Sequence, residues 1–162
     1  MAAGKNESEV NEQMRVVLGG TFSPLHDGHR ALLRYATSQA TELIIGVTVN
    51  SMVQDKKHPI APFAERVAGV MDFVRSLAPD LSVTIAPLHD TYGHTVSEDY
   101  DLLVVSPETM TGALRINFKR REAGKPPLRI AEIGWVLAED GHPISSTRIW
   151  AGEIDEYGRF VR

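Results

Sequence analysis

Short apolar runs rich in valine, isoleucine and leucine recur along this chain, with stretches of helical character between them. The runs are residues 16–18, 43–49, 81–85, 102–105 and 128–137. Continuous apolar runs are typical of strands buried on both faces of a sheet. Residues 29–39, 62–77 and 108–122 instead carry apolar side chains at helical spacing. This alternation predicts an α/β fold, with five strands in a mostly parallel sheet and helices on both of its faces.

The length and composition fit one domain. The 162 residues are 43% hydrophobic, which allows a substantial core. We expect a single domain over residues 14–162. We expect a disordered segment over the polar residues 1–13, which lack the apolar core of a secretory signal. The chain contains no cysteine, so disulfides, thiolate metal sites and cysteine nucleophiles are excluded. These features favour a soluble, cytoplasmic protein.

The segment GGTFSPLHDGH, residues 19–29, directly follows the first predicted strand. Open parallel sheets bind their ligands at this place, and free N–H groups at the start of a helix favour an anion. Gly20 and Gly28 let a ligand approach the backbone, while His26 and His29 would share one side of the first helical turn. Each histidine alone is better explained as a core or loop residue. The whole pattern predicts a phosphate site.

A second pattern, PISSTR at residues 143–148, has the composition of a capped helix start. Ser145 and Ser146 are good capping residues, and Arg148 one turn later could bind phosphate oxygens. Neither G-x-G-x-x-G after the first strand nor G-x-x-x-x-G-K-[ST] is present, so dinucleotide-dependent oxidoreductases and P-loop kinases are unlikely classes.

Together, the two patterns resemble the nucleotidyltransferase superfamily that carries H-x-G-H and I-S-S-T-x-[IV] motifs. This resemblance implies a Rossmann-like, doubly wound fold and transfer of a nucleoside monophosphate from a triphosphate, with release of pyrophosphate. The segments LHDTYGHT and LLVVSPETMTGALRINFKRREAGKPPLRI further resemble archaeal phosphopantetheine adenylyltransferases and the matching domain of eukaryotic coenzyme A synthase. That resemblance covers nearly the whole chain from about residue 14. It implies adenylyl transfer from ATP, with magnesium, to 4′-phosphopantetheine in coenzyme A biosynthesis.

The resemblance also implies roles for individual residues, in a direct displacement without a covalent intermediate. His29 and His26 would donate to the phosphates, and Lys56 or Lys57 would offset the repulsion between two phosphates. The expected ATP-binding residues are Gly20, Thr21, Phe22, His26, Gly28, His29, Glu108, Thr109, Ser145, Ser146, Thr147 and Arg148. The expected acceptor-binding residues are Thr21, Lys56, Lys57, Arg115 and Asn117. We expect no protein-bound metal, because magnesium would arrive with ATP. Ser23 departs from the aspartate or asparagine that many relatives carry.

Three alternatives remain at this stage. The acceptor could be nicotinamide mononucleotide, a flavin, or glycerol phosphate with CTP. The protein could be a nucleotide sensor without activity. A nucleic-acid-binding module could use the basic helix 115–125, because Arg115, Lys119, Arg120, Arg121, Lys125 and Arg129 lie close together although the net charge is −4. Clusters of this kind are more often a solvated helix face. A homo-oligomer is possible, and we expect no membrane partner.

Overall fold

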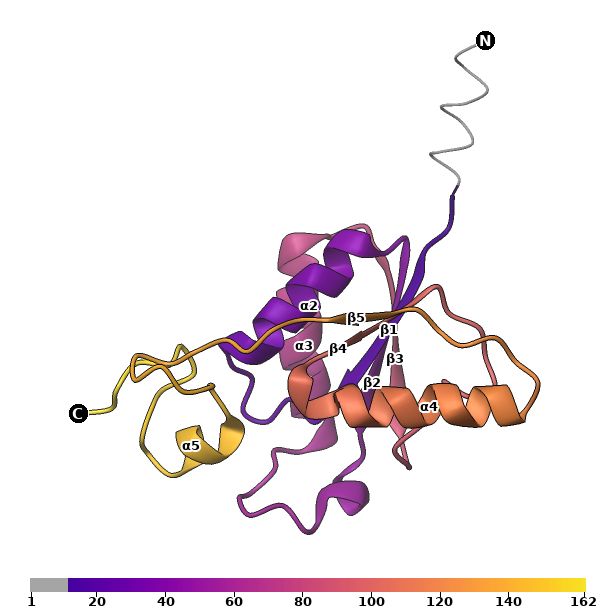
Figure 1. Ribbon diagram of the computed structural model, residues 1–162. Coiled ribbons are helices and arrows are strands. Elements are labelled where there is room, and N and C mark those ends of the chain that lie inside the picture. The colour runs from indigo at the N-terminus through magenta and orange to yellow at the C-terminus, as the bar shows by residue number, and fades with distance from the viewer. Residues whose placement is uncertain (1–11) are drawn as a thin grey trace.

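A computed structural model describes residues 12–162, so most of the segment expected to be disordered lies outside the described residues. Five parallel strands form one sheet in the order β3-β2-β1-β4-β5 (Figure 1). The strands are β1 (Arg15–Gly20), β2 (Glu42–Thr48), β3 (Ser82–Leu88), β4 (Leu102–Val105) and β5 (Ile130–Glu132). The Rossmann-like parallel five-stranded sheet predicted from the sequence is confirmed.

Helices cover both faces of the sheet, as the alternation of elements predicts (Figure 1). Helices α2 (Asp27–Gln39) and α3 (Phe63–Leu77) lie on one face, and α4 (Met110–Glu122) lies on the other. A short helix, α5 (Ser146–Trp150), follows near the C-terminus, and two 3₁₀ turns, η1 (Asn50–Val53) and η2 (Pro107–Thr109), follow β2 and β4. No helix within residues 12–162 has the length and apolar character needed to cross a membrane.

The central strand β1 divides the core into two layers because successive side chains point to opposite faces. Val16 and Leu18 pack with α2 and α3, whereas Val17 packs with Ala113 and Ile116 of α4. Each aliphatic side chain buried in this way contributes about 1.5–3 kcal/mol of hydrophobic stabilisation. The carboxyl ends of the paired strands therefore sit at one rigid edge, which fixes the loops that follow them.

Two of the predicted strands differ from the structure. β3 is an edge strand whose residues alternate in exposure, so it is not buried on both faces. The apolar run 128–137 forms only the three-residue strand β5. Beyond it the chain leaves the sheet, and Leu137 forms an antiparallel bridge with Pro143. This turn starts a small C-terminal core of Ala138, Ile144 and Ile154, which competes with the sheet for the apolar residues of the run.

Candidate active site

A cavity of about 390 Å³ lies where β1 and β4 end, and it joins the two motifs of the sequence. Residues of the segment 19–29 form one wall, and residues 144–147 form another. Where the walls approach each other, the hydroxyl of Ser146 donates to the carbonyl of Pro24 across 3.4 Å. Two segments separated by most of the chain therefore share one cleft.

The two histidines hold each other in defined tautomers at the start of α2. The Nδ1 atom of His26 accepts from the backbone N–H groups of Gly28 at 3.0 Å and His29 at 3.4 Å. In return, the backbone N–H of His26 donates to Nδ1 of His29 across 3.2 Å. Because both Nδ1 atoms accept, the proton of each neutral ring resides on Nε2. The two rings stack with their centroids 3.7 Å apart, so the two neutral donors lie side by side.

Both imidazoles are neutral at pH 7. Burial, with a smaller contribution from the Arg30 guanidinium, lowers the pKa of His26 from 6.5 to about 4. Burial and the neighbouring His26 ring hold the pKa of His29 well below its usual value. Arg30 is itself fixed by ion pairs with Asp27 and Glu156. Each ring therefore carries a neutral N–H donor at pH 7 and is not a cation.

The backbone between β1 and the histidines is folded tightly against the cavity. Phe22 has a left-handed φ of 56°, and its ring packs on Gly20, where an added Cβ atom would come within 3.0 Å of it. The same ring lies 5.1 Å from the His29 ring. Gly20 is thus required for close packing of the loop as well as for access to its amides.

The loop between β2 and α3 brings two lysines to this cavity. Lys56 and Lys57 both line it, and no contact distinguishes them. The loop is fastened to the histidine segment by Ser23, whose hydroxyl accepts from the Ala61 N–H across 3.0 Å. Ser23 is only 7% exposed. The hydroxyl at position 23 therefore has a structural role.

Comparison with known proteins agrees with this geometry. Residues 17–152 match the family model described as cytidylyltransferase-like. A phosphopantetheine adenylyltransferase of Archaeoglobus fulgidus is 43% identical over 91% of this chain and 100% of its own length. One of Methanopyrus kandleri is 47% identical over 88% of this chain and 91% of its own.

The chain belongs to the phosphopantetheine adenylyltransferase family. Among solved structures, a protein of unknown function from Archaeoglobus fulgidus is 39% identical and superposes with a TM-score of 0.69, over 74% of this chain and 89% of its own. Pantothenate synthetase of Thermus thermophilus shares only 15% identity, with a TM-score of 0.56 over 85% of this chain and 61% of its own. The latter likeness concerns the fold alone.

Most residues expected to bind substrate in this phosphopantetheine adenylyltransferase line the cavity. They are Gly20, Thr21, Phe22, His26, Gly28, His29, Lys56, Lys57, Glu108, Thr109, Ser145, Ser146 and Thr147. Arg148 is not among the lining residues. Its guanidinium forms ion pairs with Asp140 and Glu153 and donates to the carbonyl of Pro143. In the structure it ties α5 to the preceding turn instead of extending toward a phosphate.

The structure also separates Arg115 and Asn117 from the other expected residues. Arg115 lines a different cavity. Asn117 is buried, and its side-chain amide exchanges two hydrogen bonds with the backbone of Leu128. Because these bonds use both ends of the amide, Asn117 is a structural residue that fixes the chain after α4, and we withdraw it as an acceptor ligand.

Several lining residues of this cavity were not singled out from the sequence, among them Asp55, His58, Ser106 and Trp135. Asp55 and His58 flank the two lysines, so their position in that loop was an available signal. Ser106 caps the turn after β4, where its hydroxyl lies 3.3 Å from that of Thr109. Trp135 lies within the apolar run assigned to a strand, and only the departure of the chain from the sheet brings it to the cavity.

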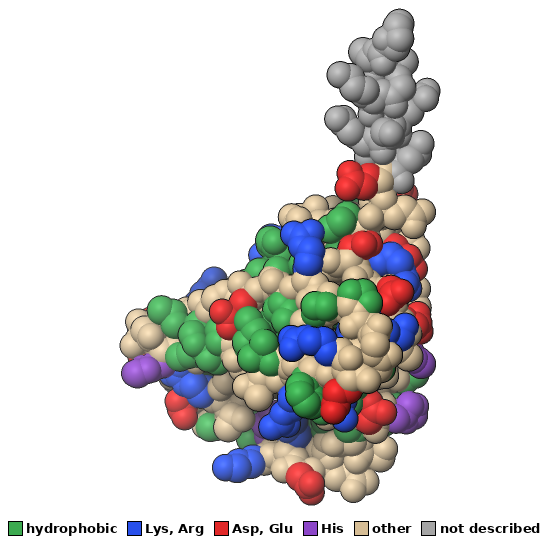
Figure 2. Space-filling model, turned by 45° about the vertical axis from the view of Figure 1, so that its right-hand side comes forward, with side chains coloured by type: hydrophobic (Ala, Val, Ile, Leu, Met, Phe, Trp, Pro, Cys, Tyr) green, Lys and Arg blue, Asp and Glu red, His purple; other side chains and the backbone are tan. Residues whose placement is uncertain are grey.

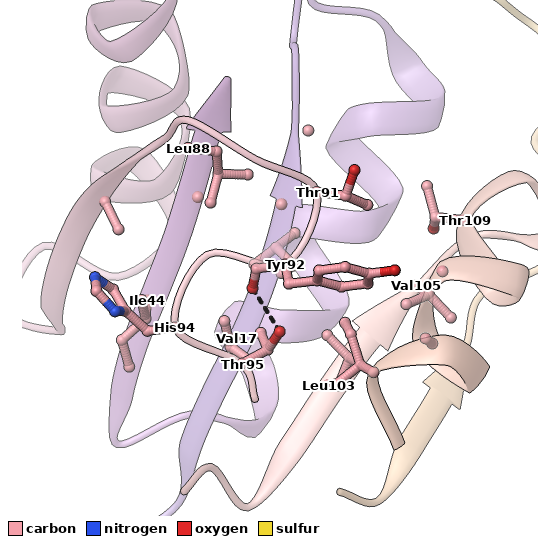
Figure 3. Close-up of a pocket in the computed structure, with 18 of the residues that line it drawn as sticks. Val17, Ile44, Leu88, Thr91, Tyr92, His94, Thr95, Leu103, Val105 and Thr109 are labelled. Carbon is pink, nitrogen blue, oxygen red and sulfur yellow. Dashed lines mark hydrogen bonds between the residues drawn. The ribbon is translucent and has the colours of Figure 1, made fainter. Parts of the chain in front are cut away.

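A second cavity, of about 530 Å³, lies between the sheet and α4 (Figure 3). Val17, Ile44 and Leu103 form its floor, and Tyr92 lies across it from the loop after β3. Gly19, Gly20, Glu108 and Thr109 line both cavities, so the two adjoin where β1 and β4 end. The protein thus has a more polar cavity beside a largely apolar one.

Proposed function

We propose that this protein transfers the adenylyl group of ATP to 4′-phosphopantetheine, giving dephospho-coenzyme A and pyrophosphate. The observation that carries the proposal is the convergence of the histidine segment and residues 144–147 on one cavity. The names of the relatives support the acceptor, since phosphopantetheine adenylyltransferases match over nearly the whole chain.

The reaction is a displacement at the α-phosphorus of ATP. An oxygen of the 4′-phosphate forms the new bond, the bond to the bridging oxygen of the leaving group breaks, and pyrophosphate departs as an anion. The attacking phosphate is already an anion at pH 7, so no general base is needed. Neutral His26 and His29 fit this requirement because they donate hydrogen bonds without exchanging protons. Catalysis then depends on alignment and charge stabilisation.

Each wall of the cavity receives one part of the reacting phosphates. His29 donates through Nε2–H to the α-phosphate, and His26 donates beside it. Thr21 orients the acceptor phosphate, and Lys56 or Lys57 offsets the repulsion between the two reactants. The start of α5, with Ser145 and Ser146, receives the pyrophosphate. Arg148 supports this helix rather than the phosphate itself.

The second cavity holds the pantetheine arm. The arm is a long chain with two amides and a gem-dimethyl group, which suits a mostly apolar chamber with a few hydroxyls. Thr48, Thr91 and Thr109 supply such hydroxyls along the lining. Because the chambers adjoin at Gly20 and Thr109, a phosphate in the first can continue into an arm in the second. Arg115 belongs to this chamber, so its expected contact would be with the arm.

The adenine base stacks against Trp135. This side chain is 50% exposed and lines the first cavity next to residues 144–147. Stacking of a base on an aromatic side chain typically contributes about 1–3 kcal/mol. Magnesium arrives as the complex with ATP. Within residues 12–162, no three His, Asp or Glu side chains cluster as a ready-made metal cage.

The test is incubation with ATP, magnesium and 4′-phosphopantetheine, followed by mass analysis. Dephospho-coenzyme A with equimolar pyrophosphate is expected. Parallel reactions with nicotinamide mononucleotide, a flavin mononucleotide, or glycerol phosphate with CTP test the other acceptors. ATP binding without pyrophosphate in any reaction would identify a nucleotide sensor and overturn the proposed activity.

The burial of one member of the basic cluster weakens the case for nucleic-acid binding by α4. Arg120 is 1% exposed and paired with Asp99, so it is not available to a nucleic acid, whereas Arg115, Lys119 and Arg121 are exposed. On the face in Figure 2, Lys and Arg side chains are interspersed with acidic and hydrophobic ones. Counterion-driven binding needs a continuous basic surface. Filter binding to RNA at moderate salt should therefore show no retention.

A further inference from the structure

A buried arginine without an acidic partner lies directly behind the phosphate cavity. Arg66 of α3 is 3% exposed, and its guanidinium forms three hydrogen bonds, all to neutral oxygens. Nε donates to the carbonyl of Ala61 at 2.8 Å, one Nη to the carbonyl of Thr21 at 3.0 Å, and the other to Oδ1 of Asn50 at 2.9 Å. The ring of Phe63 lies 5.7 Å from the guanidinium carbon.

The other fixed arginines of the described chain differ from Arg66 in one respect. Arg15, Arg30, Arg120 and Arg148 each form an ion pair with at least one carboxylate. Within residues 12–162, no carboxylate lies within 4.0 Å of the Arg66 nitrogens. Burial is accordingly the only cause that moves its pKa, which it lowers. A buried charge normally needs a partner, because desolvation makes an unpaired one costly.

The three acceptors of Arg66 also belong to the two loops that build the phosphate site. Thr21 stands in the loop that leads to the histidines, whereas Asn50 and Ala61 bound the loop that carries Lys56 and Lys57. The Asn50 side chain additionally donates to the Ala61 carbonyl at 3.2 Å. One guanidinium therefore sets the distance between the lysine loop and the histidine loop.

We infer that Arg66 is a positioning residue whose unpaired positive charge is completed by the phosphates of the substrates. This inference rests on the proposed function. It assigns a role in phosphate binding to a charged residue that does not itself line the cavity. The cost of burying the cation is offset when anionic phosphates enter next to Thr21. The planar guanidinium of Arg66 also holds the loop that carries Lys56 and Lys57. Loss of this geometry should therefore lower turnover, whereas loss of the positive charge should weaken phosphate binding.

The decisive variant is Asn50→Asp, which keeps the shape of the side chain and the acceptor for Arg66, loses the hydrogen bond to Ala61 and places a negative charge beside Arg66. The matched control is Gln39→Glu, the same amide-to-acid change at the exposed far end of α2, about 18 Å along the helix from its start. Calorimetric titration with inorganic pyrophosphate, ATP and adenosine measures the result. Thermal melting records whether folding is retained, since the new ion pair with Arg66 should offset the lost hydrogen bond to Ala61.

Asn50→Asp should weaken pyrophosphate and ATP binding about tenfold, while adenosine binding and the melting midpoint hold. Gln39→Glu should leave all three affinities within about twofold of the parent chain, because an exposed charge at that distance is screened. Equal pyrophosphate affinity in the two variants, or an equal loss for adenosine, would overturn the inference. Failure to form dephospho-coenzyme A would refute only the acceptor assignment.

Arg66→Lys separates geometry from charge. Lysine keeps the positive charge but cannot reach three acceptors with a planar fork. Pyrophosphate affinity should stay within about threefold of the parent value, whereas turnover should fall at least tenfold because the lysine loop loses its anchor. Loss of pyrophosphate binding as large as in Asn50→Asp, or full turnover, would contradict the assignment.

Discussion

Arg120 of α4 donates a hydrogen bond of 2.9 Å to the carbonyl of Thr95, in the loop that roofs the second cavity. The same guanidinium donates to the carbonyls of Glu98 and Pro126 and pairs with Asp99. Arg120, which belongs to a basic cluster in the sequence, therefore has a structural role in the folded chain, where it holds neighbouring loops together. Arg120 connects the loop carrying Tyr92 to the helix on the other side of the chamber.

Replacing Arg120 with methionine should raise KM for 4′-phosphopantetheine at least tenfold while KM for ATP changes less than threefold, because only the roof of the second cavity loosens. The change also leaves buried carbonyls unpaired, each at a cost of about 1–3 kcal/mol. Initial rates measured while each substrate is varied in turn give the two KM values and test this difference. Arg121→Met, on the exposed side of the same helix, is the control and should leave both constants unchanged.

His29→Ala should lower kcat about 100- to 1,000-fold, the usual effect of losing one donor to a transition-state oxygen. The fold should persist because α2 keeps its N-cap in His26. Single-turnover rates of dephospho-coenzyme A formation measure the effect. His142→Ala, an exposed histidine outside both cavities, should retain the parent rate, and near-normal turnover in His29→Ala would remove His29 from the mechanism.

The free energy of unfolding should fall as the pH drops from about 6.5 to 4. The pKa of His26 is about 4 in the folded chain, against 6.5 when unfolded. Between these values the unfolded state binds more protons, so protonation favours unfolding by up to about 3 kcal/mol for this group. Below about pH 4 this contribution is constant.

Urea unfolding of the parent chain and of His26→Asn between pH 7 and 4 tests whether His26 causes this loss of stability. Asparagine remains a good N-cap but does not titrate, so the pH dependence in this window should shrink. The aspartates with lowered pKa values, such as Asp99 and Asp140, lose their stabilising charge only below their usual value of 3.8. An unchanged slope in His26→Asn would show that other groups cause the loss.

Gly46→Ala should weaken binding of 4′-phosphopantetheine about tenfold or more. An added Cβ on β2 would lie 2.9 Å from the Leu88 side chain, which must then move within the second cavity. Pantetheine should compete with 4′-phosphopantetheine for the second cavity, so its inhibition of adenylyl transfer gives an independent measure of binding there. Gly46→Ala with unaltered affinity for both compounds would place the arm elsewhere.

Gly69→Ala is the matched control for Gly46→Ala, because the added methyl group at position 69 meets no neighbouring side chain. Apart from its chain neighbours and the backbone of its own helix, nothing lies within 4 Å of the Cβ position at Gly69, in the interior of α3. Alanine favours a helix over glycine by about 1 kcal/mol. The midpoint of thermal unfolding should rise by a few degrees with KM values unchanged, and a lower midpoint would mean that α3 does not tolerate the methyl group.

Local patterns were sufficient for the fold. Buried runs such as residues 43–49 and the helical spacing in 62–77 each repeat one physical rule, so alternation alone predicted the parallel sheet. The two segments that line the first cavity were also predictable, because glycine, histidine and serine at this spacing favour a helix start with free N–H groups. The end of the last strand was not visible, since Trp135 has strand propensity and leaves the sheet only through packing in the C-terminal core.

The sequence by itself determined the type of sheet, the two segments that line one cavity and, through its resemblance, the chemistry to expect. Only the tertiary structure decided which charged residues serve that chemistry. Arg120, Arg148 and Arg66 are the same residue type, yet Arg120 holds a loop, Arg148 connects α5 to the preceding turn, and Arg66 is buried against the carbonyl of Thr21 without a carboxylate partner. The reason is physical. The effect of a guanidinium depends on its burial and on the acceptors around it, and distant parts of the chain supply those acceptors.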